Sequence, residues 1–261
     1  MALTPKFVER GYLGDKIIWP RDSWPLSRPA TMAWWRSDIR RMLTLDGSEN
    51  VSAWKDMVAG RLMQQATVGS RPQYLADGFA GYPGVKFTLG KFLEYAATPW
   101  PINAVSSMML VVCDQLESPI NTDLQVLASY GNTAVGQRKI IRSVREGVNR
   151  GGFEIGNTWT TDLFEQARVI FSGIHSVVAF FGDVSSTATL DDSVFSGTSS
   201  LALRTPAGGR TRIGADSADV VPTQFCNAVI RDVIIIDVAL LNGNEDFQNY
   251  AKWANNRRVP W

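Results

Sequence analysis

Short apolar segments dominate the sequence from Thr31 onward, and glycine, proline or other turn residues interrupt them every few residues. Within SSMMLVVC at 106–113, the six residues 108–113 are apolar throughout, which suits a strand buried on both faces. LQVLASYG at 124–131 and GIHSVVAFFGD at 173–183 continue the same rhythm. Many short strands at this spacing predict an all-β fold, an antiparallel β-sandwich of two packed sheets.

The end of the chain departs from this rhythm and predicts one surface helix over about 243–257. Its apolar positions fall at i, i+3, i+4 and i+7, as on one face of a helix: Phe247, Tyr250, Ala251 and Ala254. Asn242 or Asn244 is suited to cap its start, and Pro260 follows its end. The preceding segment, 229–238, is expected to be a central strand, because 233–236 is apolar on both faces.

Residues 1–29 form a separate, extended arm in this interpretation, and residues 30–261 form the sandwich with its helix. The arm contains KIIWPRDSWPLSRP, in which proline disfavours regular helix and central strand. Exposed tryptophans favour a partner surface, so the sequence predicts partner binding by Trp19, Pro20, Trp24 and Pro25. The alternative is that the two tryptophans pack back onto their own domain.

Composition limits the classes of partner. The formal net charge of the 261 residues is +1, which excludes strong electrostatic capture of nucleic acid by the whole molecule. No apolar run reaches the roughly 20 residues that cross a bilayer, and the first residues lack the apolar core of a signal peptide. We therefore expect synthesis in the cytoplasm, with neither nucleic acid nor membrane as partner. Cys113 and Cys226 lie in apolar runs and are expected to be buried free thiols.

Several motifs in order resemble those of concanavalin A-like lectin/glucanase (laminin G-like) jelly-roll domains. The segment IRDVIIIDVALLNGNEDFQNYAKW at 230–253 is similar to the C-terminal signature of that family, with Asp232 where glutamate is usual. AWWRSD at 33–38, RPQYLADGFAGYPGVKF at 71–87 and RIGA at 212–215 resemble earlier elements. The resemblance implies a jelly roll whose terminal helix closes one side and whose core includes Trp34, Trp35, Trp54 and Trp253. Domains of this family without a signal peptide are frequent in tailed-phage virion proteins and in large cell-surface proteins, and the resemblance implies one of these settings.

No catalytic residues are assigned from the sequence. A glycoside hydrolase of this fold needs carboxylates on one strand face in an E-x-D pattern, and no E-x-D occurs. The nearest acidic groups are expected to be turn and surface residues: Asp162, Glu165, Asp191 and Asp192. His175 is the single histidine and is expected to pack in a strand, and one histidine with two scattered cysteines supports no zinc site.

Calcium and glycans are the two classes of ligand that the sequence leaves to consider. Calcium is carried by some laminin G-like domains, and Asp77, Asp216 and Asp219 lie in suitable loops, but no run concentrates them, so no cofactor is expected. For a glycan, aromatic side chains stack on sugar rings, and Trp159 in IGNTWTTD is the candidate glycan-binding residue. A core or rim position for Trp159 is the alternative.

These observations lead to three hypotheses. The first is a non-enzymatic structural or interaction protein of a tailed-phage virion, a capsid decoration or tail-associated jelly roll that its arm anchors to other virion proteins or to copies of itself. The second is a carbohydrate-binding module that recognises a host-surface glycan. The third is a glycoside hydrolase of laminarinase type.

Overall fold

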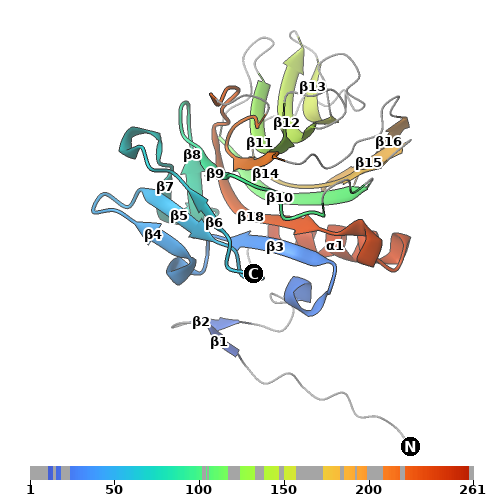
Figure 1. Ribbon diagram of the computed structural model, residues 1–261, viewed down its shortest axis with the longest axis horizontal. Helices are drawn as coiled ribbons and strands as arrows, with labels where there is room; N and C mark the ends of the chain where they lie inside the picture. The colour runs from blue at the N-terminus through green and yellow to red at the C-terminus, as the bar shows by residue number, and fades with distance from the viewer. Residues whose placement is uncertain are drawn as a thin grey trace, which may run out of the picture.

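The computed structural model describes residues 11–13, 16–18, 24–101, 104, 106–116, 124–132, 138–146, 150–156, 173–182, 185–191, 193–198, 208–217 and 221–258. Within these residues, two antiparallel sheets face each other and one α-helix lies near the C-terminus (Figure 1). The predicted antiparallel β-sandwich with a C-terminal helix is confirmed.

The first sheet contains eight strands in the described part of the chain, with β18 at its centre. β18 pairs with β10 on one side and with β3 and β8 on the other. The strands run in the order β16-β15-β14-β10-β18-β8-β7, with β3 beside β18. Their bounds are β3 Thr31–Arg36, β7 Gln73–Phe79, β8 Tyr82–Phe87, β10 Ser107–Gln115, β14 Gly173–Phe181, β15 Ser185–Leu190, β16 Ser193–Thr198 and β18 Ala228–Ile236.

The second sheet also contains eight described strands, in the order β13-β12-β11-β17-β9-β6-β5-β4. Strand β17 lies between β11 and β9, so that it pairs with two strands that are distant from it in the sequence. The bounds are β4 Leu43–Leu45, β5 Val51–Lys55, β6 Leu62–Gln64, β9 Leu93–Tyr95, β11 Leu124–Gly131, β12 Arg138–Glu146, β13 Arg150–Gly156 and β17 Arg210–Ile213.

The central strand β18 is buried on both faces, as the apolar run 233–236 predicts, and its two charged residues, Arg231 and Asp232, are buried as well. Val233 and Ile235 point into the core between the sheets, where they join Trp35, Trp54 and other side chains. Ile234 and Ile236 point to the outer face, into a second apolar cluster under the helix. Burying apolar surface at roughly 25 cal/mol per Å² makes these two layers the main source of stability.

Helix α1, Asn244–Arg258, covers the outer face of the first sheet (Figure 1). The predicted stripe is buried as expected, with Tyr250 and Ala254 fully inaccessible. Trp253 packs edge-on against Trp34 of β3, with 5.3 Å between ring centroids. All four tryptophans assigned to the core by the resemblance are buried: Trp34, Trp35, Trp54 and Trp253.

Two short strands and a 3-10 helix precede the sandwich. Strands β1, Gly11–Leu13, and β2, Lys16–Ile18, pair with each other as a separate hairpin. The 3-10 helix η1, Trp24–Ser27, lies against α1, with Trp24 edge-on to Tyr250 at 4.8 Å between centroids. The described residues contain three other 3-10 turns: η2 Arg40–Met42 between β3 and β4, η3 Val68–Ser70 between β6 and β7, and η4 Val238–Leu240 between β18 and α1.

Candidate functional site

A hollow of about 630 Å³ lies beside strands β6, β9 and β17 of the second sheet. Ligand pockets usually measure about 300–1,000 Å³. Strand ends, the turn after β6 and the segment after β9 supply its lining, which consists of Leu62, Gln64, Gln65, Ala66, Phe92, Glu94, Tyr95, Ala96, Ala97 and Arg212.

Three polar side chains of the hollow stand in one row across three strands. Glu94 of β9 is the registered partner of Gln64 in β6 and of Arg212 in β17. Side chains alternate along a strand, and the residues preceding Gln64 and Glu94, namely Met63 and Leu93, point into the core. The row of Gln64, Glu94 and Arg212 therefore lies on the outer face of the sheet.

The Glu94 carboxylate is held by one of its two oxygens. Arg212 Nε donates to Glu94 Oε2 at 2.7 Å, and Arg210 Nη1 lies 3.5 Å from the same oxygen. Glu94 is one quarter exposed, and among the described residues no donor reaches its Oε1. This leaves one carboxylate oxygen as an acceptor for a ligand.

Arg212 is the anchor of this arrangement. Its side chain is 1% exposed, and its Nη1 also donates to the backbone oxygen of Asp216. Burial lowers the pKa of Arg212 below its ordinary value, and the hydrogen bond that Arg212 donates to Glu94 opposes that shift. Its guanidinium lies over the ring of Phe92 at 5.6 Å. Arg212 thus fixes both the carboxylate and an aromatic wall of the hollow.

A glycine at the end of β17 supports this geometry. Gly214, in the RIGA element, has a φ of +87°, in the region that favours glycine. A β-carbon there would lie 2.3 Å from Phe87 Cδ1. The close approach explains why glycine follows the strand that carries Arg212.

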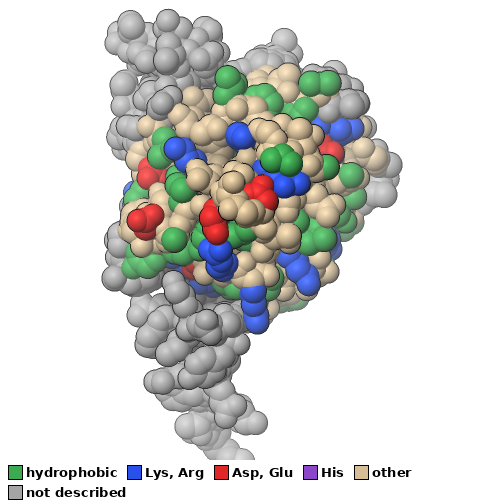
Figure 2. All heavy atoms as spheres, turned by 90° about the vertical axis from the view of Figure 1, so that its left-hand side faces the viewer, with side chains coloured by type: hydrophobic (Ala, Val, Ile, Leu, Met, Phe, Trp, Pro, Cys, Tyr) green, Lys and Arg blue, Asp and Glu red, His purple; other side chains and the backbone are tan. Residues whose placement is uncertain are grey.

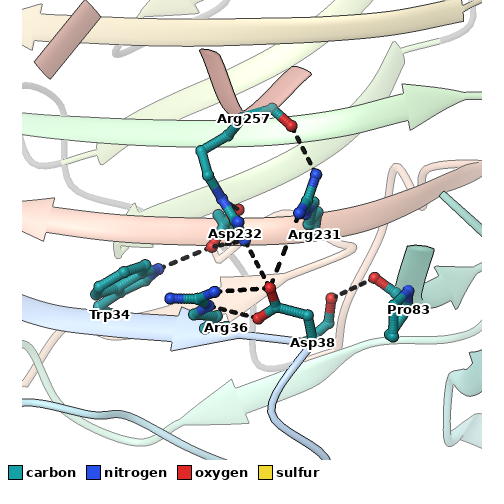
Figure 3. A network of polar contacts seen from close by, with 8 residues as sticks. Trp34, Arg36, Asp38, Pro83, Arg231, Asp232 and Arg257 are labelled. Atoms are coloured by element: carbon teal, nitrogen blue, oxygen red, sulfur yellow. Dashed lines mark hydrogen bonds and ion pairs between the residues drawn. The ribbon is translucent and has the colours of Figure 1, made fainter. Parts of the chain in front are cut away.

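A second group of charged side chains is an ionic cluster buried between the first sheet and the C-terminal end of α1 (Figure 3), formed by Arg36, Asp38, Arg231, Asp232 and Arg257. Asp38 accepts two hydrogen bonds from Arg36 and one from Arg257. Asp232 accepts from Arg257 at 3.0 Å and from Trp34 Nε1 at 2.9 Å. Both oxygens of each aspartate are therefore engaged.

The ionic cluster ties the helix end to the sheet. Arg231 Nη1 donates to the backbone oxygen of Arg257 at 2.8 Å, which satisfies a carbonyl that a helix end leaves without an internal partner. Burial alone would raise the pKa of Asp38, but the guanidinium groups of Arg257 and Arg36 outweigh it and hold that pKa well below its usual range. These contacts are structural, because the three arginines and Asp232 are at most 5% exposed and Asp38 is 13% exposed.

The residues that the sequence assigns to partner binding fall in two groups. Trp24 and Pro25 contact their own domain: Arg28 lies over the Trp24 ring at 4.8 Å, and Thr31 Oγ1 donates to the Pro25 oxygen at 2.6 Å. Trp19 and Pro20 lie outside the described residues, as does the candidate glycan-binding residue Trp159. Partner binding by the arm and glycan binding by Trp159 remain predictions.

His175 is a buried strand residue, as predicted. Its Nδ1 lies 3.1 Å from Asp191 Oδ2, and Arg258 Nη1 lies 3.3 Å from the same oxygen. Asp191 occupies the turn after β15, with a φ of +55°, and also accepts the backbone N–H of Ser176. The group joins a turn, a strand and the end of α1. Asp162, Glu165 and Asp192 lie outside the described residues.

The aspartates considered for calcium do not form a described site. Asp77 lies in β7 of the first sheet, Asp216 lies beside Arg212 near the second sheet, and Asp219 is outside the described residues. In the described part of the chain, no three His, Cys, Asp or Glu side chains are grouped closely enough to hold a metal ion. Both cysteines are buried, as expected.

Sequence reasoning missed Gln64, Glu94 and Arg212. It searched for carboxylates at alternate positions of one strand, whereas these residues come from three strands and meet only through the pairing of β9 with β6 and β17. Glu94 and Arg212 are separated by 118 residues in sequence. The local signal was an isolated glutamate flanked by aromatic residues in KFLEYA.

Comparison with known proteins shows what the fold is similar to. No protein-family model matches the sequence, and no curated protein matches it. Solved structures do match. A GH54 α-L-arabinofuranosidase aligns with a TM-score of 0.58 at 12% identity, over 80% of this chain and 51% of the enzyme. This chain therefore spans about half the length of that enzyme.

Two other structures are informative. Domain 4 of AbnA, a GH43 extracellular arabinanase from Geobacillus stearothermophilus solved in complex with arabinotriose, aligns with a TM-score of 0.57 at 12% identity, over 88% of this chain and 98% of the domain. The enzymatically active domain of tailspike protein 2 from bacteriophage CBA120 aligns with a TM-score of 0.52 at 10% identity, over 70% of this chain and 29% of the tailspike chain. At these identities the likeness is one of fold.

These neighbours correct the leading hypothesis. The expectation of a non-enzymatic structural protein is wrong, because the structures that share this sandwich belong mostly to carbohydrate-active enzymes: arabinofuranosidases, an arabinanase and a sialidase. The sequence reasoning excluded enzymes because it found no E-x-D pattern, and that pattern is specific to one hydrolase type.

Two further observations concern the surface. Among the described residues, no helix combines the length and the apolar character needed to cross a bilayer. On the face shown in Figure 2, acidic and basic side chains are interspersed with hydrophobic ones, and neither sign forms a continuous field.

Proposed function

We propose that this chain is a carbohydrate-active β-sandwich domain that holds an oligosaccharide in the hollow of the second sheet. The observation that carries the proposal is the row of Gln64, Glu94 and Arg212, with one Glu94 oxygen open to a ligand, on a fold shared with carbohydrate-active enzymes.

The composition of the hollow supports a saccharide. Phe92 and Tyr95 contribute aromatic surface to its lining, and Leu62 adds aliphatic surface. Saccharide sites combine apolar surface for the C–H faces of sugar rings with a few placed polar groups for the hydroxyls, as ligand pockets do in general. Domain 4 of AbnA, 98% of which aligns with this chain, was solved with arabinotriose.

The described geometry supports binding more directly than hydrolysis. Glycoside hydrolysis uses two carboxyl groups that flank the scissile bond, about 5–5.5 Å or about 6.5–9.5 Å apart. Glu94 is the single carboxylate among the described residues that line the hollow. A catalytic step would therefore need a second carboxylate from outside this lining.

A glycan array tests the proposal. Purified protein is expected to bind a defined set of oligosaccharides, and Glu94→Gln is expected to weaken that signal. Glu245→Gln is the matched control, because Glu245 is an exposed residue of α1 on the other sheet. Mass spectrometry of the same oligosaccharides after incubation distinguishes binding from cleavage. The absence of any glycan signal from the folded wild-type protein would refute the proposal.

We also propose that the sandwich is of the concanavalin A-like jelly-roll kind and that the domain is part of a tailed-phage virion. The order of motifs from Ala33 to Trp253 supports the first point, and the similarity to a bacteriophage tailspike domain supports the second. Immunogold labelling of phage particles from cells that make the protein tests the location, and particles without label would contradict it.

Partner binding by Trp19 and Pro20 is retained as a separate proposal, with other virion proteins or copies of this chain as partners. Light scattering on the full chain and on a chain without residues 1–23 tests the second case. The full chain is expected to form an oligomer and the truncated chain to contain fewer protomers per particle. The same number of protomers in both would remove self-association from the proposal.

A further inference from the structure

We infer that the hollow takes a neutral saccharide and discriminates against uronic acids and other anionic sugars, with Glu94 and Gln64 holding neighbouring hydroxyl groups of one sugar ring. This inference rests on the proposed function, because it names the class of oligosaccharide that the same hollow would bind.

The arginines beside the hollow are already paired with carboxylates of the protein itself. Arg212 has Glu94 at its Nε and Asp216 close enough to influence it electrostatically. Arg210 is the second cation near Glu94, is about a quarter exposed, and does not line the hollow. An anionic ligand inside the hollow would therefore meet no cationic group reserved for it.

Glu94 Oε1, which no described donor reaches, is a hydrogen-bond acceptor. Glu94 Oε2 receives the two arginines, and Oε1 is the oxygen left for a ligand. An ionised carboxylate can only accept hydrogen bonds. The group that meets Oε1 must therefore donate, as a sugar hydroxyl does, whereas a ligand carboxylate or sulfate brings no proton and is repelled.

Gln64 supplies the complementary group beside it. It lies directly across from Glu94 in the pairing of β6 with β9, its side chain is exposed, and no described residue hydrogen-bonds to its amide. Facing residues on paired strands have β-carbons about 4.5–5.5 Å apart. The Gln64 amide offers an NH₂ group that donates and a carbonyl oxygen that accepts, within reach of the atoms near Glu94. Hydroxyls on adjacent ring carbons suit such a pair.

The apolar part of the hollow completes the fit to a neutral ring. Phe92 contacts the Arg212 guanidinium, 5.6 Å from its ring centroid, and the tilted ring of Phe225, whose centroid is 6.3 Å away. A ring held by such contacts loses little conformational freedom on binding, which favours affinity. A phosphate or sulfate ester would gain nothing from this surface and would face Glu94.

The test is a glycan array in which each uronic acid oligosaccharide is printed beside its carboxyl-reduced, neutral counterpart. The full chain is expected to bind neutral members at least tenfold more tightly than their acidic partners. Equal or tighter binding of the acidic members would overturn this inference and leave the proposed function standing. If no glycan of either kind binds, the proposed function fails.

Three variants test which residues bind the glycan. Calorimetry measures the affinity of each variant for the neutral glycan that binds best on the array. Glu94→Gln is expected to weaken binding about tenfold or more, because a charge-assisted hydrogen bond becomes a neutral one, and to reduce the discrimination against the acidic counterpart. Gln64→Ala is expected to weaken binding several-fold without affecting folding, since its side chain is exposed. Glu245→Gln is the control and should bind as the wild type does. Wild-type affinity in both Glu94→Gln and Gln64→Ala would overturn the assignment.

Discussion

The ionic cluster under α1 and the hollow on the second sheet both contain arginine–carboxylate pairs. They differ in how many of the carboxylate oxygens accept hydrogen bonds from within the protein. In the ionic cluster, Asp232 accepts from Trp34 at one oxygen and from Arg257 at both. In the hollow, Glu94 has both arginines at one oxygen and none of the described donors at the other. A closed set of contacts fastens elements together, and an incomplete set can receive a ligand.

Burial follows the same division. The side chains of Asp232 and Arg257 are 0% and 2% exposed, whereas Glu94 is 25% exposed although its anchor Arg212 is buried. Removing one partner from a closed, buried pair leaves an uncompensated charge. The hollow can tolerate a change at Glu94, because a quarter of its side chain is exposed to solvent. The account therefore predicts opposite effects on stability and binding in the two regions.

The largest effect is expected for Asp232→Asn. Both oxygens of Asp232 accept hydrogen bonds, so an amide nitrogen at either position would face a donor from Trp34 or Arg257. We expect a loss of about 3–5 kcal/mol in the free energy of unfolding, measured by urea denaturation. A loss below about 1 kcal/mol would show that the ionic cluster does not fasten α1.

The second-largest effect is expected from low pH, which weakens the ionic cluster. The pKa of Asp38 is lower in the folded state than in the unfolded chain. Asp38 therefore contributes stability above about pH 4, and this contribution is lost as the pH falls below that value. Between pH 7 and pH 2, the wild type should lose about 2 kcal/mol more than Asp38→Asn does. Parallel pH profiles for the two proteins would contradict the assignment.

The extent to which the sequence predicted the fold follows from the range of the interactions. The strand 228–236 and the helix 244–258 depend on local periodicity, so both could be predicted with ends within one or two residues of those observed. The burial of Trp34 and Trp253 followed from motif order. By contrast, the ionic cluster joins Asp38 to Arg257, which are 219 residues apart. No local pattern signals such a contact.

The candidate site was less accessible to sequence reasoning for the same reason. Gln64, Glu94 and Arg212 meet only because β17 pairs with β9, and single-sequence patterns do not specify which distant strands pair. Trp159, which the sequence did single out, lies outside the described residues, so its role remains a prediction. A search for isolated acidic residues beside aromatics within strands would have included Glu94.

Trp24→Ala tests a smaller contribution on the helix side. Trp24 packs on Tyr250 and under Arg28, so we expect a loss of about 1–2 kcal/mol in unfolding free energy of the isolated protein. Thermal and urea denaturation measure it. Unchanged stability with impaired self-association would instead assign Trp24 to partner binding, as the sequence suggested.

The smallest effect on stability is expected for Glu94→Gln. The glutamine oxygen can keep the hydrogen bond from Arg212, and its amide nitrogen can occupy the open position of Oε1. We expect a change below about 1 kcal/mol by urea denaturation, together with the weaker glycan binding described above. A loss as large as that of Asp232→Asn would mean that Glu94 is as structural as the ionic cluster.

The central claim is that saccharide binding belongs to the second sheet and not to the helix-covered face. Hydrogen–deuterium exchange of the wild-type protein, with and without its best neutral glycan, tests this directly. The account predicts slower exchange in peptides from β6, β9 and β17, with α1 and β3 unchanged. Protection confined to α1, or to residues 157–172 around Trp159, would contradict it.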